Sequence, residues 1–377
     1  MTTNSMATIC EGFATRELDS SSDSDVLAQL AVEGQRRIDA FVFELLFKQQ
    51  LKKIACDRTG LFLAFGWHIG YDRDGEPAYW FRLMDHADDW NECDQSMMRA
   101  LQRLTVGRSD SAKIVRVLFR SEENVFAGSI ADQGSWEGWT SLVAVLDRLP
   151  RRGRRRDPRA MTNAVPLNKF VAFDWLQKPR LRHELQALSI QRRFMNCLLG
   201  PHLGRDGTDL DAMVKTPDGK LRCVEFKRKY PAMGEHKFFG LDVWPHVNTV
   251  RTLASIGIES LHVILVGPIW EKRQSPVGWL NDRSLDPHWT WLAASLDDQA
   301  FETQVLHTSG TDSGHRVAER DQRSIKWDRI RVLNAGLSFG QSGVDAFRRH
   351  LEDAPSAEGS CASYQGLYDR RAGGHPT

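Results

Sequence analysis

The sequence is poor in cysteine, and the cysteines it has are scattered. Its six cysteines form no C-x-x-C pair and no compact Cys/His spacing. This usage indicates neither a disulfide framework nor a structural zinc site, and it favours a reducing, cytoplasmic compartment.

Long apolar runs are also absent. The longest, such as 61–66 and 261–269, are far shorter than the roughly 18 residues that a membrane-spanning helix needs. The first thirty residues are acidic and rich in serine, and they lack the apolar segment of a secretory signal. We therefore expect neither export nor a membrane partner.

Several catalytic motifs are missing as well. The sequence has no G-x-x-x-x-G-K-[ST] phosphate loop and no H-E-x-x-H pair, and Gly134–Gly138 is not a nucleophile elbow. These absences disfavour a P-loop nucleotidase, a zinc protease and an α/β-hydrolase.

What is present is an ordinary globular composition in a chain long enough for two domains. The 377 residues are 41% hydrophobic and 26% charged. The sequence predicts a fold of the α/β class, α+β overall. The predicted divisions are a disordered tail at 1–25, an α+β domain at 26–149, an arginine-rich linker at 150–164, a second domain at 165–340, and a short helix with a disordered tail at 341–377.

Charge is distributed unevenly along the chain. Residues 1–150 carry 16 Lys and Arg against 23 Asp and Glu, whereas residues 151–237 carry 20 against 9, a net charge of +11. Residues 238–377 carry 14 against 17. A concentrated basic segment attracts polyanions such as nucleic acid, although a solvated linker has the same composition.

The N-terminal domain shows helical and strand patterns. Apolar residues at helical spacing predict an amphipathic helix or helix pair within 26–54, and 61–71 with 77–84 predict a hairpin. Its tryptophans and tyrosines are more often core residues than surfaces on which bases stack. We expect this domain to select a substrate or a protein partner, or to form a homodimer.

The most informative segment is 207–229, which reads as a second hairpin. Pro217-Asp218-Gly219 fits a three-residue loop in which glycine takes the left-handed position. In the resulting register, paired residue numbers add up to 436, so Asp211 lies opposite Glu225 and Asp209 opposite Lys227. Two facing carboxylates repel each other unless a cation lies between them, and oxygen ligands suit Mg²⁺ or Mn²⁺.

Asp211, Glu225 and Lys227, spaced D-x₁₄-E-x-K, resemble the PD-(D/E)XK, or restriction-endonuclease-like, nuclease superfamily. The resemblance covers the second domain only and implies an αβββαβ core. It implies Asp211 and Glu225 as metal ligands and Lys227 as the group that positions water. It also implies an acidic ligand on a preceding helix, and Glu184 is the only carboxylate of the predicted helix 178–199.

Some features depart from the family pattern. Leu210 stands where the motif has proline, and the segment 200–207, where the first core strand is expected, is short and turn-like. Downstream, 244–255 predicts a helix and 261–266 a buried strand, in the order of the family core.

The sequence therefore predicts a Mg²⁺- or Mn²⁺-dependent nuclease that hydrolyses phosphodiester bonds, with DNA favoured over RNA. The catalytic residues are Asp211, Glu225, Lys227 and Glu184, the first two and Glu184 being metal ligands. Basic side chains would bind phosphates, namely Arg228, Lys229, Arg151, Arg152, Arg154, Arg155 and Arg156.

Two other hypotheses fit the sequence. A nuclease-like fold can bind nucleic acid or another protein without cutting it. Alternatively, the N-terminal domain is an interaction module, and the basic run docks on an acidic partner. A surface hairpin whose acidic and basic residues form cross-strand ion pairs is the purely structural explanation of the motif.

Overall fold

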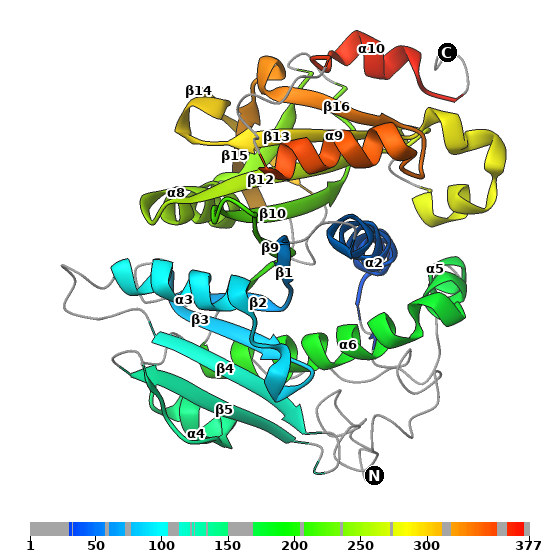
Figure 1. Cartoon of the computed structure of the whole chain (residues 1–377). Coiled ribbons are helices and arrows are strands. Elements are labelled where there is room, and N and C mark those ends of the chain that lie inside the picture. The colour runs from blue at the N-terminus through cyan, green and yellow to red at the C-terminus, as the bar shows by residue number, and fades with distance from the viewer. Residues whose placement is uncertain are drawn as a thin grey trace. The chain divides into compact units, whose positions relative to one another are not determined.

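A computed structural model gives the structure of the chain (Figure 1). It is a mixed α/β structure, as the sequence predicts. The residues that it describes are 30–31, 33–56, 60–71, 77–104, 113–120, 123, 125–132, 135–149, 169–203, 207–233, 237–271, 274–310, 318–352 and 360–372.

The chain forms two compact units, and each unit is made of two separate stretches. The first unit comprises 1–38 and 64–210, and the second comprises 39–63 and 211–377. The predicted linker at 150–164 lies outside the described residues. The division thus differs from a simple N-terminal and C-terminal pair of domains, because 39–63 belongs with the C-terminal half of the chain.

The first unit is built on a seven-stranded sheet. Its strand order is β6-β5-β4-β3-β2-β8, with β7 also paired to β5. The strands are β2 (Trp67–Tyr71), β3 (Pro77–Met84), β4 (Lys113–Arg120), β5 (Val125–Asp132), β6 (Ser135–Trp136), β7 (Thr140–Ser141) and β8 (Thr208–Leu210). The predicted pairing is confirmed for 67–71 with 77–84, since β2 and β3 pair antiparallel, whereas 62–64 of the predicted first strand belong to the six-stranded sheet.

Two helices of the first unit are α3 (Glu92–Arg103) and α4 (Leu142–Asp147). The others are η1 (Ala87–Asp89), α5 (Phe170–Leu176), η3 (Pro179–Leu181), α6 (Arg182–Arg193), η4 (Phe194–Leu199) and α7 (Gly200–Leu203). Cys197, on η4, is disulfide-bonded, a bond that the scattered cysteines did not predict.

A buried aspartate organises the first unit. Asp94, in the first turn of α3, is fully buried and accepts hydrogen bonds from Arg82 Nε at 2.7 Å and Trp67 Nε1 at 2.8 Å. Its other oxygen accepts from the backbone N–H of Asn91, whose side chain in turn caps the helix. Asp94 therefore joins α3 to two neighbouring strands of the sheet.

The second unit contains a six-stranded sheet of order β1-β9-β10-β12-β13-β16 and a three-stranded sheet of order β11-β15-β14. The first sheet is made of β1 (Phe62–Ala64), β9 (Ala212–Lys215), β10 (Leu221–Arg228), β12 (Ile258–Val266), β13 (Thr290–Leu296) and β16 (Ile330–Ala335). The second is made of β11 (Phe239–Asp242), β14 (Phe301–Gly310) and β15 (Ala318–Ile325).

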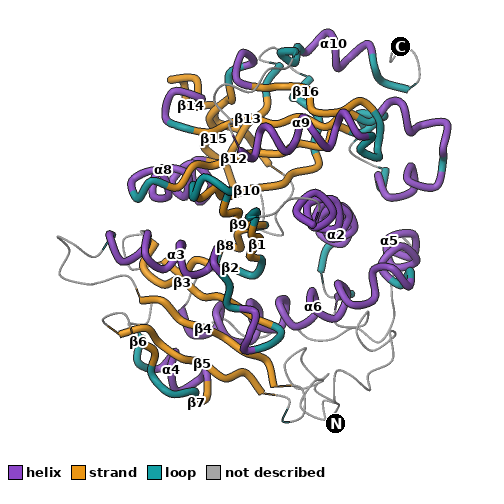
Figure 2. Tube along the Cα trace, viewed as in Figure 1, coloured by secondary structure: helices purple, strands orange, loops and turns teal. Residues whose placement is uncertain are grey.

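The helix and the buried strand predicted after the E-x-K segment are both found, and β11 precedes them in the chain. β10 and β12 are parallel neighbours, and α8 (Asn248–Ser255) lies between them in the chain (Figure 2). The remaining helices of this unit are α2 (Gln35–Cys56), η5 (Val243–Val247), η6 (Pro276–Asn281), η7 (Arg283–His288), η8 (Asp298–Ala300), η9 (Trp327–Arg329), α9 (Gln341–Glu352) and α10 (Tyr364–Asp369).

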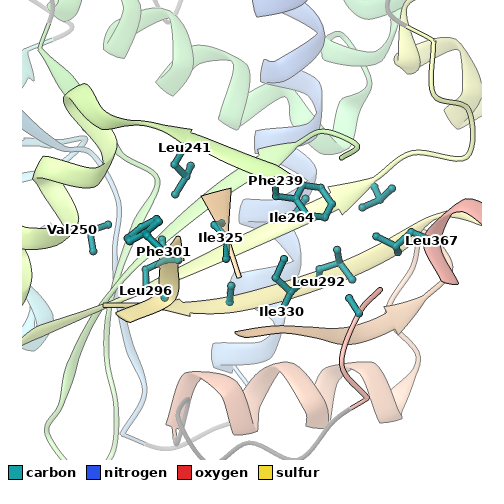
Figure 3. Packing of buried hydrophobic residues seen from close by; sticks show 14 of the residues in the cluster. Phe239, Leu241, Val250, Ile264, Leu292, Leu296, Phe301, Ile325, Ile330 and Leu367 are labelled. Carbon is teal, nitrogen blue, oxygen red and sulfur yellow. The ribbon is translucent and has the colours of Figure 1, made fainter. Parts of the chain in front are cut away.

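Two packed layers cover β10. Phe226 points to α2, where its ring stacks on that of Phe47 with centroids 4.8 Å apart. A hydrophobic cluster packs the six-stranded sheet together with the three-stranded sheet (Figure 3), and it includes Phe239, Leu241, Ile264, Leu292, Phe301 and Ile325.

The C-terminal segment was predicted to be disordered beyond a short helix, and this prediction is wrong for part of it. Helix α10 forms there, and Leu367 packs in the hydrophobic cluster at 3% exposure. Tyr364 and Tyr368 place their rings against Trp270, 5.7 and 5.9 Å away. These long-range aromatic contacts could not be inferred from the polar composition of the segment.

Within the described residues, no helix combines the length and apolarity that crossing a membrane requires.

Candidate functional site

The hairpin of β9 and β10 has the predicted register. Arg222 pairs with Val214 and Val224 with Ala212, so paired numbers add up to 436. The Thr216 N–H donates to Lys220 O at 2.9 Å, which closes the three-residue loop, and Gly219 has a φ of +86°. Local turn chemistry thus fixes which face each hairpin side chain occupies.

Gly219→Ala tests this turn. No atom outside the adjacent residues lies within 4 Å of an added Cβ, so the cost is the left-handed backbone alone. We expect about 1 kcal/mol of lost stability. Urea unfolding measures it, and Gly278→Ala, at an open position without a left-handed φ, is the control. Equal stability losses in both variants would contradict the turn assignment.

Asp211 lies one residue beyond the last pair of the β9–β10 ladder. It is 8% exposed, and its Oδ2 accepts a hydrogen bond from the backbone N–H of Phe226 at 2.6 Å. That bond holds the carboxylate beside the middle of β10, next to the position of Glu225.

Glu225 and Lys227 lie on the same side of β10, because alternate residues of a strand share a face. Lys227 Nζ contacts Glu225 Oε1 at 2.5 Å. His246, on η5, places its Nδ1 3.7 Å from the same oxygen. One carboxylate oxygen is therefore shared by two basic groups.

The electrostatics of Lys227 are dominated by carboxylates. Burial by itself lowers the pKa of Lys227, but Glu225 and Asp211 outweigh it and raise that pKa above its ordinary value, with a smaller contribution from Glu44. Lys227 is therefore a permanent cation at neutral pH, and the negative charges of three acidic residues stabilise it.

Glu44 was missed in the sequence. It lies on α2, in the same unit as Asp211, Glu225 and Lys227. The signal was present, because Glu44 is the only polar residue of the run Phe41–Phe47. A carboxylate within a buried helical run needs a cation or a hydrogen-bond partner, and Lys227 supplies a nearby positive charge.

Glu184, the predicted helix ligand, is found in the first turn of α6 and belongs to the first unit. The prediction that Asp209 faces Lys227 is wrong. Asp209 pairs with His68 of β2 and accepts a hydrogen bond from Gln191 at 3.2 Å. The pairing of β9 with β10 ends before Asp211, because the preceding strand, β8, pairs with β2 in the seven-stranded sheet.

The predicted phosphate-binding residues separate into three groups. Arg151, Arg152, Arg154, Arg155 and Arg156 lie outside the described residues. Arg228 lies on the α2 side of β10, with its guanidinium 5.7 Å from the ring centre of Phe43. Lys229 continues the line of Glu225 and Lys227.

The donor set suits a hard divalent cation, since Asp211, Glu225 and Glu44 offer carboxylate oxygens. Across the residues that the structure describes, no three His, Cys, Asp or Glu side chains are grouped as a metal would need. The Lys227 ammonium lies against Glu225 instead and balances its charge. A metal bound through Oε1 of Glu225 would therefore compete with Lys227 for that oxygen.

No protein-family model matches this chain, and neither a curated protein nor a solved structure matches it.

Proposed function

We propose that the protein is a metal-dependent nuclease of the PD-(D/E)XK type that hydrolyses phosphodiester bonds, preferentially of DNA, in the cytoplasm. The observation that carries the proposal is the cluster around Lys227, in which Asp211 and Glu225 are brought together by the hairpin and Glu44 acts on the same ammonium. A surface hairpin with exposed ion pairs does not account for an aspartate that is 8% exposed.

The order of elements supports the same proposal. In the second unit α2 and β1 are followed, after residues 64–210, by β9, β10, α8 and β12, and β11 of the three-stranded sheet lies between β10 and α8 in the chain. Helix, three strands, helix and strand is the αβββαβ order that the resemblance implies. In this assignment the core helix is α2, and the third acidic ligand is Glu44 rather than Glu184.

The acidic residues and Lys227 have different roles in the proposed reaction. Asp211 and Glu225, with Glu44 as the third candidate ligand, would hold Mg²⁺ or Mn²⁺, and the ion would polarise a phosphate oxygen and make bound water more acidic. The Phe226 N–H fixes the orientation of Asp211. Lys227 stays protonated, so it orients the attacking water and neutralises negative charge on the phosphate instead of removing a proton.

Cleavage assays of Glu44→Gln and Glu184→Gln distinguish the two candidate ligands. We expect Glu44→Gln to lower the rate of plasmid or single-stranded DNA cleavage by at least about tenfold, because one charged ligand is lost. Glu184→Gln is the matched control and should cleave like the wild type. The reverse result would restore Glu184 as the ligand and exclude Glu44.

A further inference from the structure

Lys229 follows Lys227 by two residues, so its side chain lies on the same side of the extended chain as Glu225 and Lys227. Its backbone N–H donates to Leu265 O at 3.1 Å, which continues the pairing of β10 with β12. Its Nζ donates to the carbonyl of Gly240 at 2.7 Å. The half-buried amine is therefore held in place by a backbone carbonyl.

Within the described residues, no carboxylate forms an ion pair with this amine. Asp242, an acidic neighbour on β11, is already bound by Gln322 at 2.6 Å and by Arg320 at 3.2 Å, both from β15. The negative charge of Asp242 is therefore shared between Lys229 and Arg320. The lysine thus lacks the ion pair that usually accompanies a desolvated ammonium.

The neighbouring strand, β12, places a histidine rather than a carboxylate near this amine. His262, on β12, is the register partner of Glu225 and is fully buried. Neither of its ring nitrogens has a hydrogen-bond partner among the residues described. Burial keeps the pKa of His262 well below its ordinary value, and Lys229, Lys227 and His246 add to this effect, so the ring is neutral.

Burial and a neighbouring cation both lower the pKa of Lys229. Burial lowers its pKa to about 7, and repulsion from Lys227 contributes, while Asp242 and Glu225 oppose the shift. The free protein thus holds one fixed cation and one amine that is only partly protonated at neutral pH. An anion placed beside both would relieve their repulsion and favour the charged form.

We propose that Lys229 and Lys227 form a phosphate-binding subsite, and that Lys229 takes up a proton when a phosphate group of a nucleic acid strand binds. This inference rests on the proposed function and specifies how the site holds its substrate. Phosphate is the fitting anion because the two lysines are compact point charges two residues apart on one strand.

The sign of the pH dependence follows from linkage. A bound phosphate raises the pKa of Lys229 above the value of the free protein. Proton uptake on binding is therefore largest between about pH 7 and the higher pKa of the complex. The affinity contributed by Lys229 is fully present below pH 7 and is lost as pH rises through the pKa of the complex.

Isothermal titration calorimetry with a single-stranded DNA 12-mer tests this, in EDTA and at pH 8. Titrations in two buffers of different ionisation enthalpy give the number of protons taken up. We expect uptake of close to one proton by the wild type and none by Lys229→Arg, which binds DNA as a permanent cation. Lys229→Met should bind about tenfold more weakly below pH 7, without uptake. Lys220→Met, at an exposed lysine paired with Asp218, is the control and should behave like the wild type.

A second measurement needs neither DNA nor cleavage. Reductive methylation with ¹³C-formaldehyde, assigned with Lys229→Arg, lets NMR follow the titration of Lys229 in the folded protein. Titration near pH 7 supports the subsite, whereas an ordinary lysine pKa of about 10.4 overturns it. Equal proton uptake by the wild type and Lys229→Met, or no DNA binding by the wild type, also overturns it. Proton-linked binding without metal-dependent cleavage would instead contradict the nuclease proposal alone.

Discussion

Lys227→Met and Asp211→Asn should each lower metal-dependent DNA cleavage by about 100-fold or more. The first removes the ammonium that contacts Glu225 at 2.5 Å, and the second removes a charged ligand that the Phe226 N–H orients. Groups that stabilise charge at a reacting centre have effects of this size. Single-turnover cleavage of plasmid and single-stranded DNA, with Mg²⁺, Mn²⁺ or EDTA, measures both losses.

A matched acidic residue lies in the same hairpin. Asp218 is half-exposed in the turn, where it pairs with Lys220, and Asp218→Asn should cleave like the wild type. Circular dichroism and thermal unfolding of all three variants separate loss of chemistry from loss of folding. Cleavage that survives both Lys227→Met and Asp211→Asn would refute the site, and salt-sensitive DNA binding without any cleavage would favour a non-cleaving binding protein.

Asp94→Ala should destabilise the first unit by about 3–5 kcal/mol. The substitution leaves the guanidinium of Arg82, 6% exposed, without its carboxylate, and it removes the acceptor of the Trp67 indole. An uncompensated buried charge accounts for most of the cost. Equilibrium urea unfolding, followed by tryptophan fluorescence, measures the change.

Glu137→Ala supplies the comparison within the same unit. Glu137 and Arg148 form a bidentate pair with bonds of 2.6 and 2.7 Å, but both side chains are substantially exposed. Solvent screens such pairs, so we expect little change in unfolding. Similar losses for Asp94→Ala and Glu137→Ala would mean that burial does not control the strength of these interactions.

The hairpin of the candidate site was predictable because its determinants are local. Pro217, Asp218 and Gly219 fix the loop, the loop fixes the register, and the register places Asp211 beside Glu225. The prediction failed at Asp209, beyond the residues whose pairing the turn determines. Asp209 joins another sheet through β8, and no feature of the turn specifies that change of partner.

The helix that supports the site was not predictable by the same means. Glu184 was chosen because it precedes the hairpin closely in sequence, whereas residues 64–210 separate α2, with Glu44, from the hairpin in the chain. Sequence proximity is a poor guide when one unit interrupts another. The stacking of Phe47 on Phe226 is the long-range contact that assigns α2 to this sheet.

The environment of Lys229 was equally hidden. A sequence shows a basic E-x-K-x-K strand, and the natural reading is a set of solvated cations. Only the pairing of β10 with β12 brings an unpartnered buried histidine to the neighbouring strand. Electrostatic properties of this kind depend on cross-strand neighbours, which depend in turn on the complete topology.

The interruption of the second unit has a consequence for how the chain folds. β1 and β9 are adjacent strands, yet the entire chain of the first unit separates them. Their pairing closes a very long loop, and the entropic cost of closure rises by only about 0.6 kcal/mol for each doubling of loop length. A short glycine-serine linker from Leu63 to Asp211 should therefore leave the six-stranded sheet able to assemble, and should allow it to form faster because its contacts become local.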